Sequence, residues 1–139
     1  MKTRTHRFLR FTAAVLVWVG SQVYRPTHSA VSEDSATFQG HYLWAFEVSS
    51  FVPCGMRVRP GYGRGYWLET NNDFFRKYEA LFAKHGKALG NETVFARFEG
   101  KLGPKAEAYK GYGHMGLYLR KVEVKKLLEI RFPTDKDCK

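Results

Sequence analysis

The sequence predicts a small domain that is mainly β with one helix (α+β), and three observations lead to this prediction. Apolar residues alternate with polar ones over several segments, which is typical of strands with one buried face. One segment instead repeats its apolar residues every three or four positions, which indicates a helix. The chain has 139 residues, of which 44% are hydrophobic and 16% aromatic, so a single domain with a packed core is expected and a disordered chain is excluded.

The first expected strand is the longest and covers residues 38–52, with a bend at Gly40 or near residues 49–50. Its alternating apolar residues are Tyr42, Trp44, Phe46 and Val48. Residues 53–65 are rich in Pro and Gly and are expected to form a loop. A short second strand follows at residues 66–70.

The expected helix begins after a cap at Asn72 or Asp73, because a short side-chain oxygen can accept from an unpaired backbone N–H there. Gly90 is expected to end it, as a glycine just past the last turn often does. The residues that form its apolar stripe are Phe74, Tyr78, Leu81, Phe82, His85 and Leu89.

A third strand is expected at residues 93–102, with Val94, Ala96 and Phe98 on one face. Residues 103–113 read as a loop, and residues 114–132 as one or two further strands.

This order of elements predicts the architecture. A small antiparallel sheet must cover its apolar face and protect its edges. Curling into a small antiparallel, partly closed OB-like β-barrel meets both needs, with the helix between the second and third strands closing one end. A flat sheet carrying one helix is the alternative.

The N-terminal residues 1–30 are typical of a secretory signal peptide. Four cations, Lys2, Arg4, Arg7 and Arg10, precede a short apolar run at residues 11–20 that is too short to span a bilayer. Cleavage after position 21 or after position 30 fits the residues. The domain organisation expected is therefore a signal peptide at 1–30, a disordered lead-in at 31–37, a barrel domain at 38–132 and a polar tail at 133–139.

Export changes how the charge is interpreted. The whole chain carries a formal charge of +10, but residues 1–30 contribute five cations and no acid, so the remaining chain carries 18 basic and 13 acidic residues. An exported, mildly basic domain is expected to meet an envelope protein or an anionic glycan rather than nucleic acid. No membrane span is expected in the mature protein, and the sequence sets no oligomeric state.

Three stretches together resemble a known family: FEVSSFVPCG at 46–55, GYWLET at 65–70 and GYGHMGLYLRKVEV at 111–124. They are similar to small exported bacterial proteins related to the C-terminal OB-like domain of NlpE-type envelope lipoproteins. The resemblance implies an envelope location but no catalytic residues. The chain lacks the family's lipidation cysteine and paired-cysteine motif, so the copper and redox sensing linked to that family is not expected here.

The two cysteines, Cys54 and Cys138, are expected to pair in an oxidising compartment. A bridge across so long a loop would contribute about 3–5 kcal/mol in the chain-entropy model. The alternative is a buried free thiol at Cys54 and an unpaired thiol near the C-terminus.

Arginines are interleaved with aromatic residues in the first loop and the strand after it, a pattern that suits glycans or single strands. The alternative is a solvated loop whose aromatic residues pack back onto the barrel. Together with two residues of the later loop, the ligand-binding candidates are Arg57, Arg59, Arg64, Tyr66, Trp67, Tyr112 and His114.

Glu47 lies among apolar neighbours, so a carboxylate there would need a partner, and Arg97 is the expected one. A ligand-binding role for Glu47 is the alternative.

The sequence offers no catalytic motif, and no metal or cofactor is expected because its histidines and cysteines lack ligand spacing. The leading hypothesis is a non-enzymatic exported binding module that contacts an envelope protein or polyanion through its basic and aromatic loops. One alternative is a thiol-dependent hydrolase, in which His114 would supply the thiolate of Cys54. A purely structural envelope protein is the other.

Overall fold

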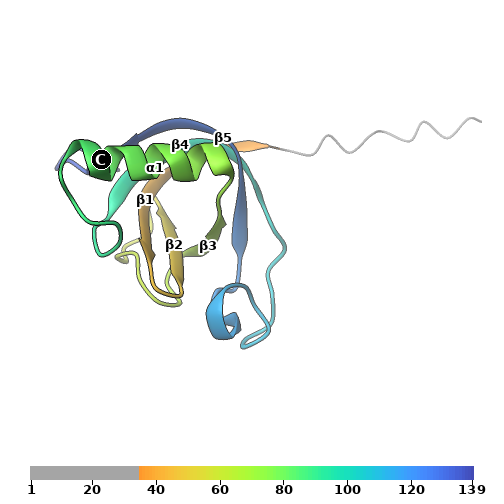
Figure 1. Cartoon of the computed structure of the whole chain (residues 1–139). Helices are drawn as coiled ribbons and strands as arrows, with labels where there is room; N and C mark the ends of the chain where they lie inside the picture. The colour runs from red at the N-terminus through yellow and green to blue at the C-terminus, as the bar shows by residue number, and fades with distance from the viewer. Residues whose placement is uncertain (1–34) are drawn as a thin grey trace, which may run out of the picture. The chain divides into compact units, whose positions relative to one another are not determined.

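The computed structural model describes residues 35–139. The expected signal peptide and most of the expected lead-in lie outside these residues. Figure 1 shows the elements, which in chain order are β1 (Ala36–Ala45), β2 (Val48–Pro53), β3 (Tyr66–Glu69), α1 (Asn72–Lys84), β4 (Val94–Leu102), the short 3-10 helix η1 (His114–Gly116) and β5 (Lys121–Arg131).

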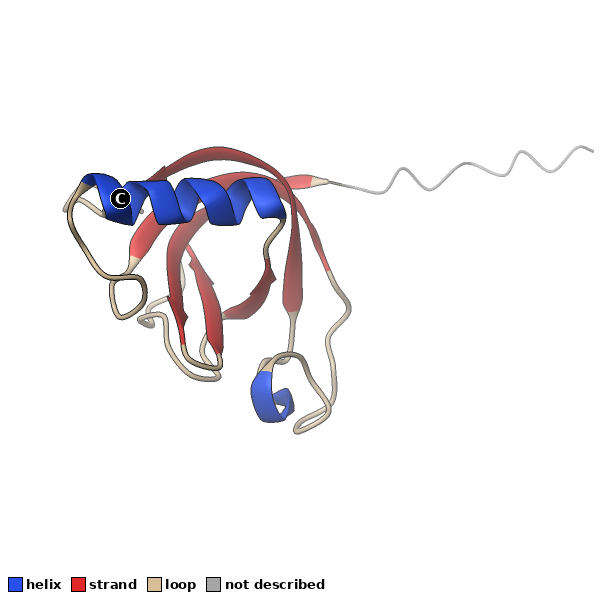
Figure 2. Cartoon of the chain, viewed as in Figure 1, coloured by secondary structure: helices blue, strands red, loops and turns tan. Residues whose placement is uncertain are grey.

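The five strands close into a barrel in the order β1-β2-β3-β5-β4, and β4 pairs back with β1. Every pair is antiparallel except β3 with β5, which run parallel. Figure 2 shows the curved strands with α1 lying across one end of the barrel. A small barrel with one helix, as the strand patterns predict, is therefore present, but it is fully closed and not partly closed, and one of its strand pairs is parallel and not antiparallel. Closure leaves neither β1 nor β4 as a free sheet edge.

The expected long first strand is wrong, because it is a hairpin of two strands. The chain turns at Phe46 and Glu47, so that Ala45 pairs with Val48 across the turn. Glu47, the second residue of this two-residue turn, takes a positive φ of 56°, the sign that a type II turn has at this position. In consequence α1 lies between the third and fourth strands, not between the second and third. β1 also begins at Ala36, inside the expected lead-in, where it pairs with Gly100.

The C-terminal strand is also shorter than the longest expectation. Residues 114–116 form η1 and not a strand, and β5 begins only at Lys121. β5 pairs with β4 over its whole length with two irregularities in register, between Arg97 and Phe98 and between Glu99 and Gly100. Such bulges let a long strand bend around a closing barrel.

The helix has the expected apolar stripe but different ends. Asn71, not Asn72 or Asp73, caps it, because the Asn71 side chain accepts from the backbone N–H of Phe74 at 2.9 Å. The helix ends at Lys84, and Gly86 follows with a φ of 63°, so Gly90 is not its end. Three stripe residues are buried and anchor the helix to the barrel: Phe74, Tyr78 and Phe82.

The core is a cluster of aromatic side chains inside the barrel and under α1. Phe98 of β4 is fully buried, and its ring lies 5.0 Å from that of Phe51 on β2 and 6.3 Å from that of Phe74 on α1. Tyr42 contacts Phe74 and Tyr78 edge to face. These ring contacts connect β1, β2, β4 and the helix, and they fix α1 over one end of the barrel.

Candidate functional site

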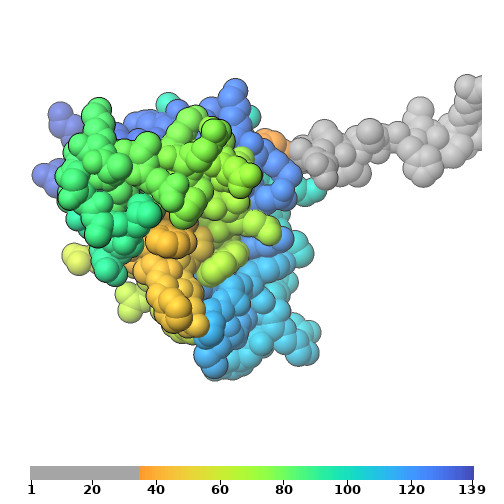
Figure 3. Space-filling model, in the orientation of Figure 1, coloured from red at the N-terminus to blue at the C-terminus, as the bar shows by residue number. Residues whose placement is uncertain are grey.

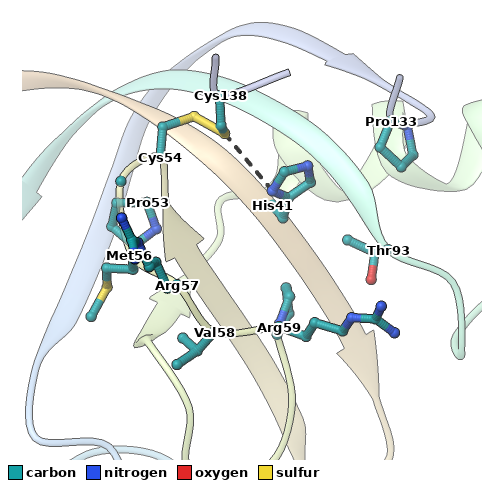
Figure 4. Close-up of a pocket in the computed structure, with 12 residues that line it drawn as sticks. His41, Pro53, Cys54, Met56, Arg57, Val58, Arg59, Thr93, Pro133 and Cys138 are labelled. Carbon is teal, nitrogen blue, oxygen red and sulfur yellow. Dashed lines mark hydrogen bonds between the residues drawn. A yellow bond between two sulfur atoms is a disulfide. The ribbon is translucent and has the colours of Figure 1, made fainter. Parts of the chain in front are cut away.

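A cavity of about 810 Å³ lies where the β2–β3 loop passes over β1 and the C-terminal tail. Figure 4 shows the lining side chains, with the Arg59 side chain extending toward Thr93. The lining residues are His41, Pro53, Cys54, Gly55, Met56, Arg57, Val58, Arg59, Pro60, Thr93, Pro133 and Cys138. We call this cavity the loop pocket.

A disulfide between Cys54 and Cys138 forms one wall of the loop pocket, so the expected bridge is confirmed. Cys54 comes directly after β2, and its backbone N–H donates to the carbonyl of Gln39 on β1 at 2.9 Å. The bridge therefore fixes the last residues of the chain against the hairpin of β1 and β2. Residues 133–139, expected as a simple polar tail, are part of the site.

An ion pair holds the tail in place before it reaches the bridge. Arg131 donates to Asp137 at two points, Nη2 to Oδ1 at 2.6 Å and Nη1 to Oδ2 at 2.9 Å. The backbone N–H of Thr134 donates to Asp137 Oδ2 at 2.7 Å. The Asp137 side chain is only 4% exposed, so these bonds are shielded from water.

This ion pair predicts a pH dependence of stability. The Arg131 guanidinium, followed by the Thr134 donors, holds the pKa of the Asp137 carboxyl well below its usual range. A carboxyl with a depressed folded-state pKa stabilises the protein fully above its unfolded pKa of about 4, and this stabilisation is lost as the pH falls further. When urea unfolding is measured as a function of pH, the free energy of unfolding of Asp137→Asn is expected to fall less steeply at acid pH than that of the unchanged protein. Asp135→Asn, on the same tail, is the control and should leave the profile unchanged.

Arg57 and Arg59 give the loop pocket its positive charge. Both side chains are exposed, and within residues 35–139 neither has a carboxylate partner. His41 lies on the opposite wall, with its Nδ1 3.9 Å from the Cys138 sulfur and its ring edge-on to Phe95. Two guanidinium groups with unused donors beside a neutral wall suit an anion with several oxygens.

The remaining ligand-binding candidates do not line the loop pocket. Trp67 packs edge to face on Tyr118, and Lys121 lies over the ring of Tyr112 at 5.7 Å. Tyr66 packs against the barrel core. The expected single cluster is therefore divided in two: Arg57 and Arg59 line the pocket, whereas Arg64, Tyr66, Trp67, Tyr112 and His114 lie outside it.

The expected pairing of Glu47 with Arg97 is wrong. Glu47 Oε2 lies 3.2 Å from Nε2 of His114, and Arg97 instead pairs with Glu129 at 3.5 Å. The reason is the hairpin: Glu47 lies in the turn at the end of the barrel, where the β4–β5 loop passes, and not on a strand beside β4.

The same geometry removes the basis of the thiol-enzyme alternative. The Cys54 sulfur is bonded to Cys138 and offers no free thiol. His114 is engaged by Glu47, and its ring centroid lies 6.0 Å from that of Tyr62. Neither the nucleophile nor its base is in place for that chemistry.

Seven lining residues of the pocket were not singled out from the sequence: Pro53, Gly55, Met56, Val58, Pro60, Thr93 and Pro133. Met56 and Val58 stand beside Arg57 and Arg59 in the loop, and all four line the pocket. No sequence pattern points to Thr93, because only the folded barrel brings this residue to the pocket.

Two smaller cavities are apolar. One, of about 570 Å³, lies between the β1–β2 hairpin, β3 and α1, and Trp44, Phe46 and Phe75 line it. The other, of about 500 Å³, lies between α1 and β5 and includes Leu81 and Leu128. Neither brings unpaired cations together as the loop pocket does.

Searches of residues 35–139 for other features gave two negative findings. No group of three His, Cys, Asp or Glu side chains in this range could hold a metal ion. No helix in this range is long and apolar enough to cross a membrane.

No family model matches the chain, and no curated protein or solved structure is significantly similar to it. The site must therefore be interpreted from its own geometry.

Proposed function

We propose that this chain is an exported, non-enzymatic OB-like module that binds an anionic glycan of the cell envelope in the loop pocket. The observation that carries the proposal is the pair Arg57 and Arg59, which line a cavity of about 810 Å³ and have no carboxylate partner within residues 35–139. Two exposed cations that serve no ion pair in the fold are free to bind a ligand anion. Their long side chains reach a polymer as it passes along the loop.

The barrel topology supports the OB-like part of the proposal. The strand order β1-β2-β3-β5-β4 with α1 between β3 and β4 is a compact five-stranded barrel closed at one end by a helix. OB barrels bind oligosaccharides and oligonucleotides on the face of strands 2 and 3, between the 1–2 and 4–5 loops. The loop pocket is a different site on the barrel, since it is built on the loop that joins β2 to β3.

Three features support export to the envelope. Residues 1–30 have the charge and apolar pattern of a signal peptide. The Cys54–Cys138 bridge requires an oxidising compartment to persist. The similarity of residues 46–55, 65–70 and 111–124 to NlpE-type proteins supports the same location.

The test is binding of a sulfated dextran fragment to the purified protein, followed by calorimetry at several salt concentrations. Arg57→Ala/Arg59→Ala is expected to weaken binding at least about tenfold, because each lost guanidinium contact is worth about 1 kcal/mol or more. The affinity of the unchanged protein should fall as salt rises.

The matched control removes two cations from the exposed face of α1, Arg76→Ala/Lys84→Ala. It changes the net charge equally but leaves the loop pocket intact. Equal weakening by both double variants would mean that net charge alone attracts the polymer, and the pocket would have no role.

A further inference from the structure

Three large apolar side chains are the most exposed of their kind within residues 35–139, and all three lie on loops at one end of the barrel. Phe46 in the β1–β2 turn is 88% exposed, and in the β4–β5 loop Tyr109 is 82% and Met115 is 71% exposed. We call these three residues the loop tip. Figure 1 shows the β1–β2 turn and η1 at the end of the barrel away from α1.

Contacts between the two loops bring the loop tip together. A contact of 3.2 Å between Oε2 of Glu47 and Nε2 of His114 links them, and Phe46 directly precedes Glu47 while Met115 directly follows His114. On the same loop the backbone N–H of Gly111 donates to the carbonyl of Gly116 at 3.1 Å, which keeps Tyr109 beside η1. In Figure 3 the atoms of the β1–β2 hairpin lie against those of the β4–β5 loop.

The backbone at the loop tip is held in an unfavourable conformation. Two of its three residues, Tyr109 and Met115, have φ values of 61° and 53°, in the left-handed region that residues other than glycine adopt only at a cost. Each such residue costs about 1 kcal/mol or more. Side chains that remain in water return none of this cost through burial, so the strain points to a role in binding.

The loops that carry the tip have an excess of positive charge. Their two acidic residues, Glu47 and Glu107, are each paired with a base, His114 and Lys110. Arg64 on the β2–β3 loop and Lys105 on the β4–β5 loop are also exposed and have no carboxylate partner within residues 35–139. An apolar tip whose own and neighbouring loops carry unpaired cations is complementary to an anionic surface with an apolar layer beneath it.

We propose that the loop tip inserts its apolar side chains among the headgroups of an anionic phospholipid bilayer. The three side chains project from two separate loops, and Tyr109 and Met115 line none of the three cavities described above. A protein partner needs a packed area of about 800 Å² on each side, whereas a fluid bilayer accommodates isolated protrusions. This membrane contact uses different residues from the loop pocket and does not depend on glycan binding.

Co-sedimentation with vesicles of equal parts phosphatidylglycerol and phosphatidylcholine tests the proposal. The unchanged protein is expected to sediment with these vesicles and to bind phosphatidylcholine vesicles more weakly. Phe46→Ser/Met115→Ser should weaken binding at least about tenfold, because burying either side chain is worth about 1.5–3 kcal/mol. The matched control, Leu89→Ser/Leu128→Ser, changes two side chains of 40% exposure outside the tip and should bind normally.

Insertion itself is tested with Phe46→Trp, which places a fluorescent reporter at the tip. The reporter is read as the difference from the unchanged protein, because the sequence already contains Trp18, in the expected signal peptide, and Trp44 and Trp67. When the anionic vesicles are added, the emission of the new tryptophan, obtained as this difference, should shift to shorter wavelength. Brominated lipid in the vesicles should quench it.

The proposal is overturned by any of three results: the protein does not sediment with the vesicles, Phe46→Ser/Met115→Ser binds as well as the unchanged protein, or the emission of the reporter in Phe46→Trp does not shift. If the tip binds a protein partner and the protein does not bind vesicles, the target of the tip is that partner and not a bilayer.

Discussion

Replacing both cysteines, Cys54→Ser/Cys138→Ser, is expected to lower the free energy of unfolding by about 4 kcal/mol. The bridge joins residues 84 positions apart, so it closes most of the barrel sequence into one loop. Its main effect is on the unfolded chain, whose entropy it reduces, and that reduction grows with loop length. The effect should therefore be among the largest that any pair of substitutions in this domain can produce.

Urea unfolding of the double variant and of the unchanged protein, each with and without reductant, measures this effect. The reduced unchanged protein should unfold at the urea concentration of the double variant, and reductant should not affect that variant. If the two proteins unfold alike without reductant, the bridge contributes nothing and its loop is already constrained in the unfolded state. Alkylation before reduction should modify neither cysteine.

Loss of the bridge should also weaken the loop pocket. Cys138 and Pro133 form part of its wall, and the tail that carries them would then be held only by the ion pair of Arg131 and Asp137. Sulfated dextran binding by Cys54→Ser/Cys138→Ser is therefore expected to fall, but less than in the variant without Arg57 and Arg59.

The sequence predicted the strands and the helix where one face is clearly buried. Val94, Ala96 and Phe98 alternate as expected on β4, and all three are buried. The stripe on α1 was equally clear, since Phe74 and Phe82 are both fully buried. Periodicity works here because the barrel interior and the solvent differ sharply along each element.

The hairpin of β1 and β2 could not be found in this way. Its turn at Phe46 and Glu47 contains no Gly, Pro or Asn, the residues that usually mark a tight turn. The alternation of Trp44, Phe46 and Val48 also runs through the turn without interruption. The turn is held by tertiary contact, the ion pair of Glu47 with His114, which lies 67 positions later in the chain.

The candidate site, too, could be predicted only in part, because tertiary structure determines which residues meet there. The sequence identified Arg57 and Arg59 because these cations are interleaved with aromatic residues in a loop dense in Pro and Gly and the strand after it. It could not show that Thr93 and Pro133 come to the same cavity while Trp67 is turned toward Tyr118. Those placements depend on how the barrel closes, which single-sequence patterns do not describe.

Phe98→Ala is expected to cost about 4 kcal/mol of unfolding free energy. Phe98 is fully buried and its ring meets three others, those of Phe38 at 5.7 Å, Phe51 at 5.0 Å and Phe74 at 6.3 Å. Truncation would leave a cavity between β1, β2, β4 and α1 that these rigid rings cannot close. Thermal and urea unfolding should both show the loss, with cooperativity retained.

Phe46→Ala is the matched substitution, because it removes the same atoms from a side chain that is 88% exposed. It should change the free energy of unfolding by less than about 0.5 kcal/mol. The two substitutions distinguish an aromatic ring that stabilises the fold from one that is exposed and available for binding. If Phe46→Ala costs as much as Phe98→Ala, Phe46 is buried in solution and the loop tip does not exist as an exposed surface. If it costs nothing, folding does not require Phe46, and a loss of vesicle binding in the same variant would assign its exposed ring to the bilayer.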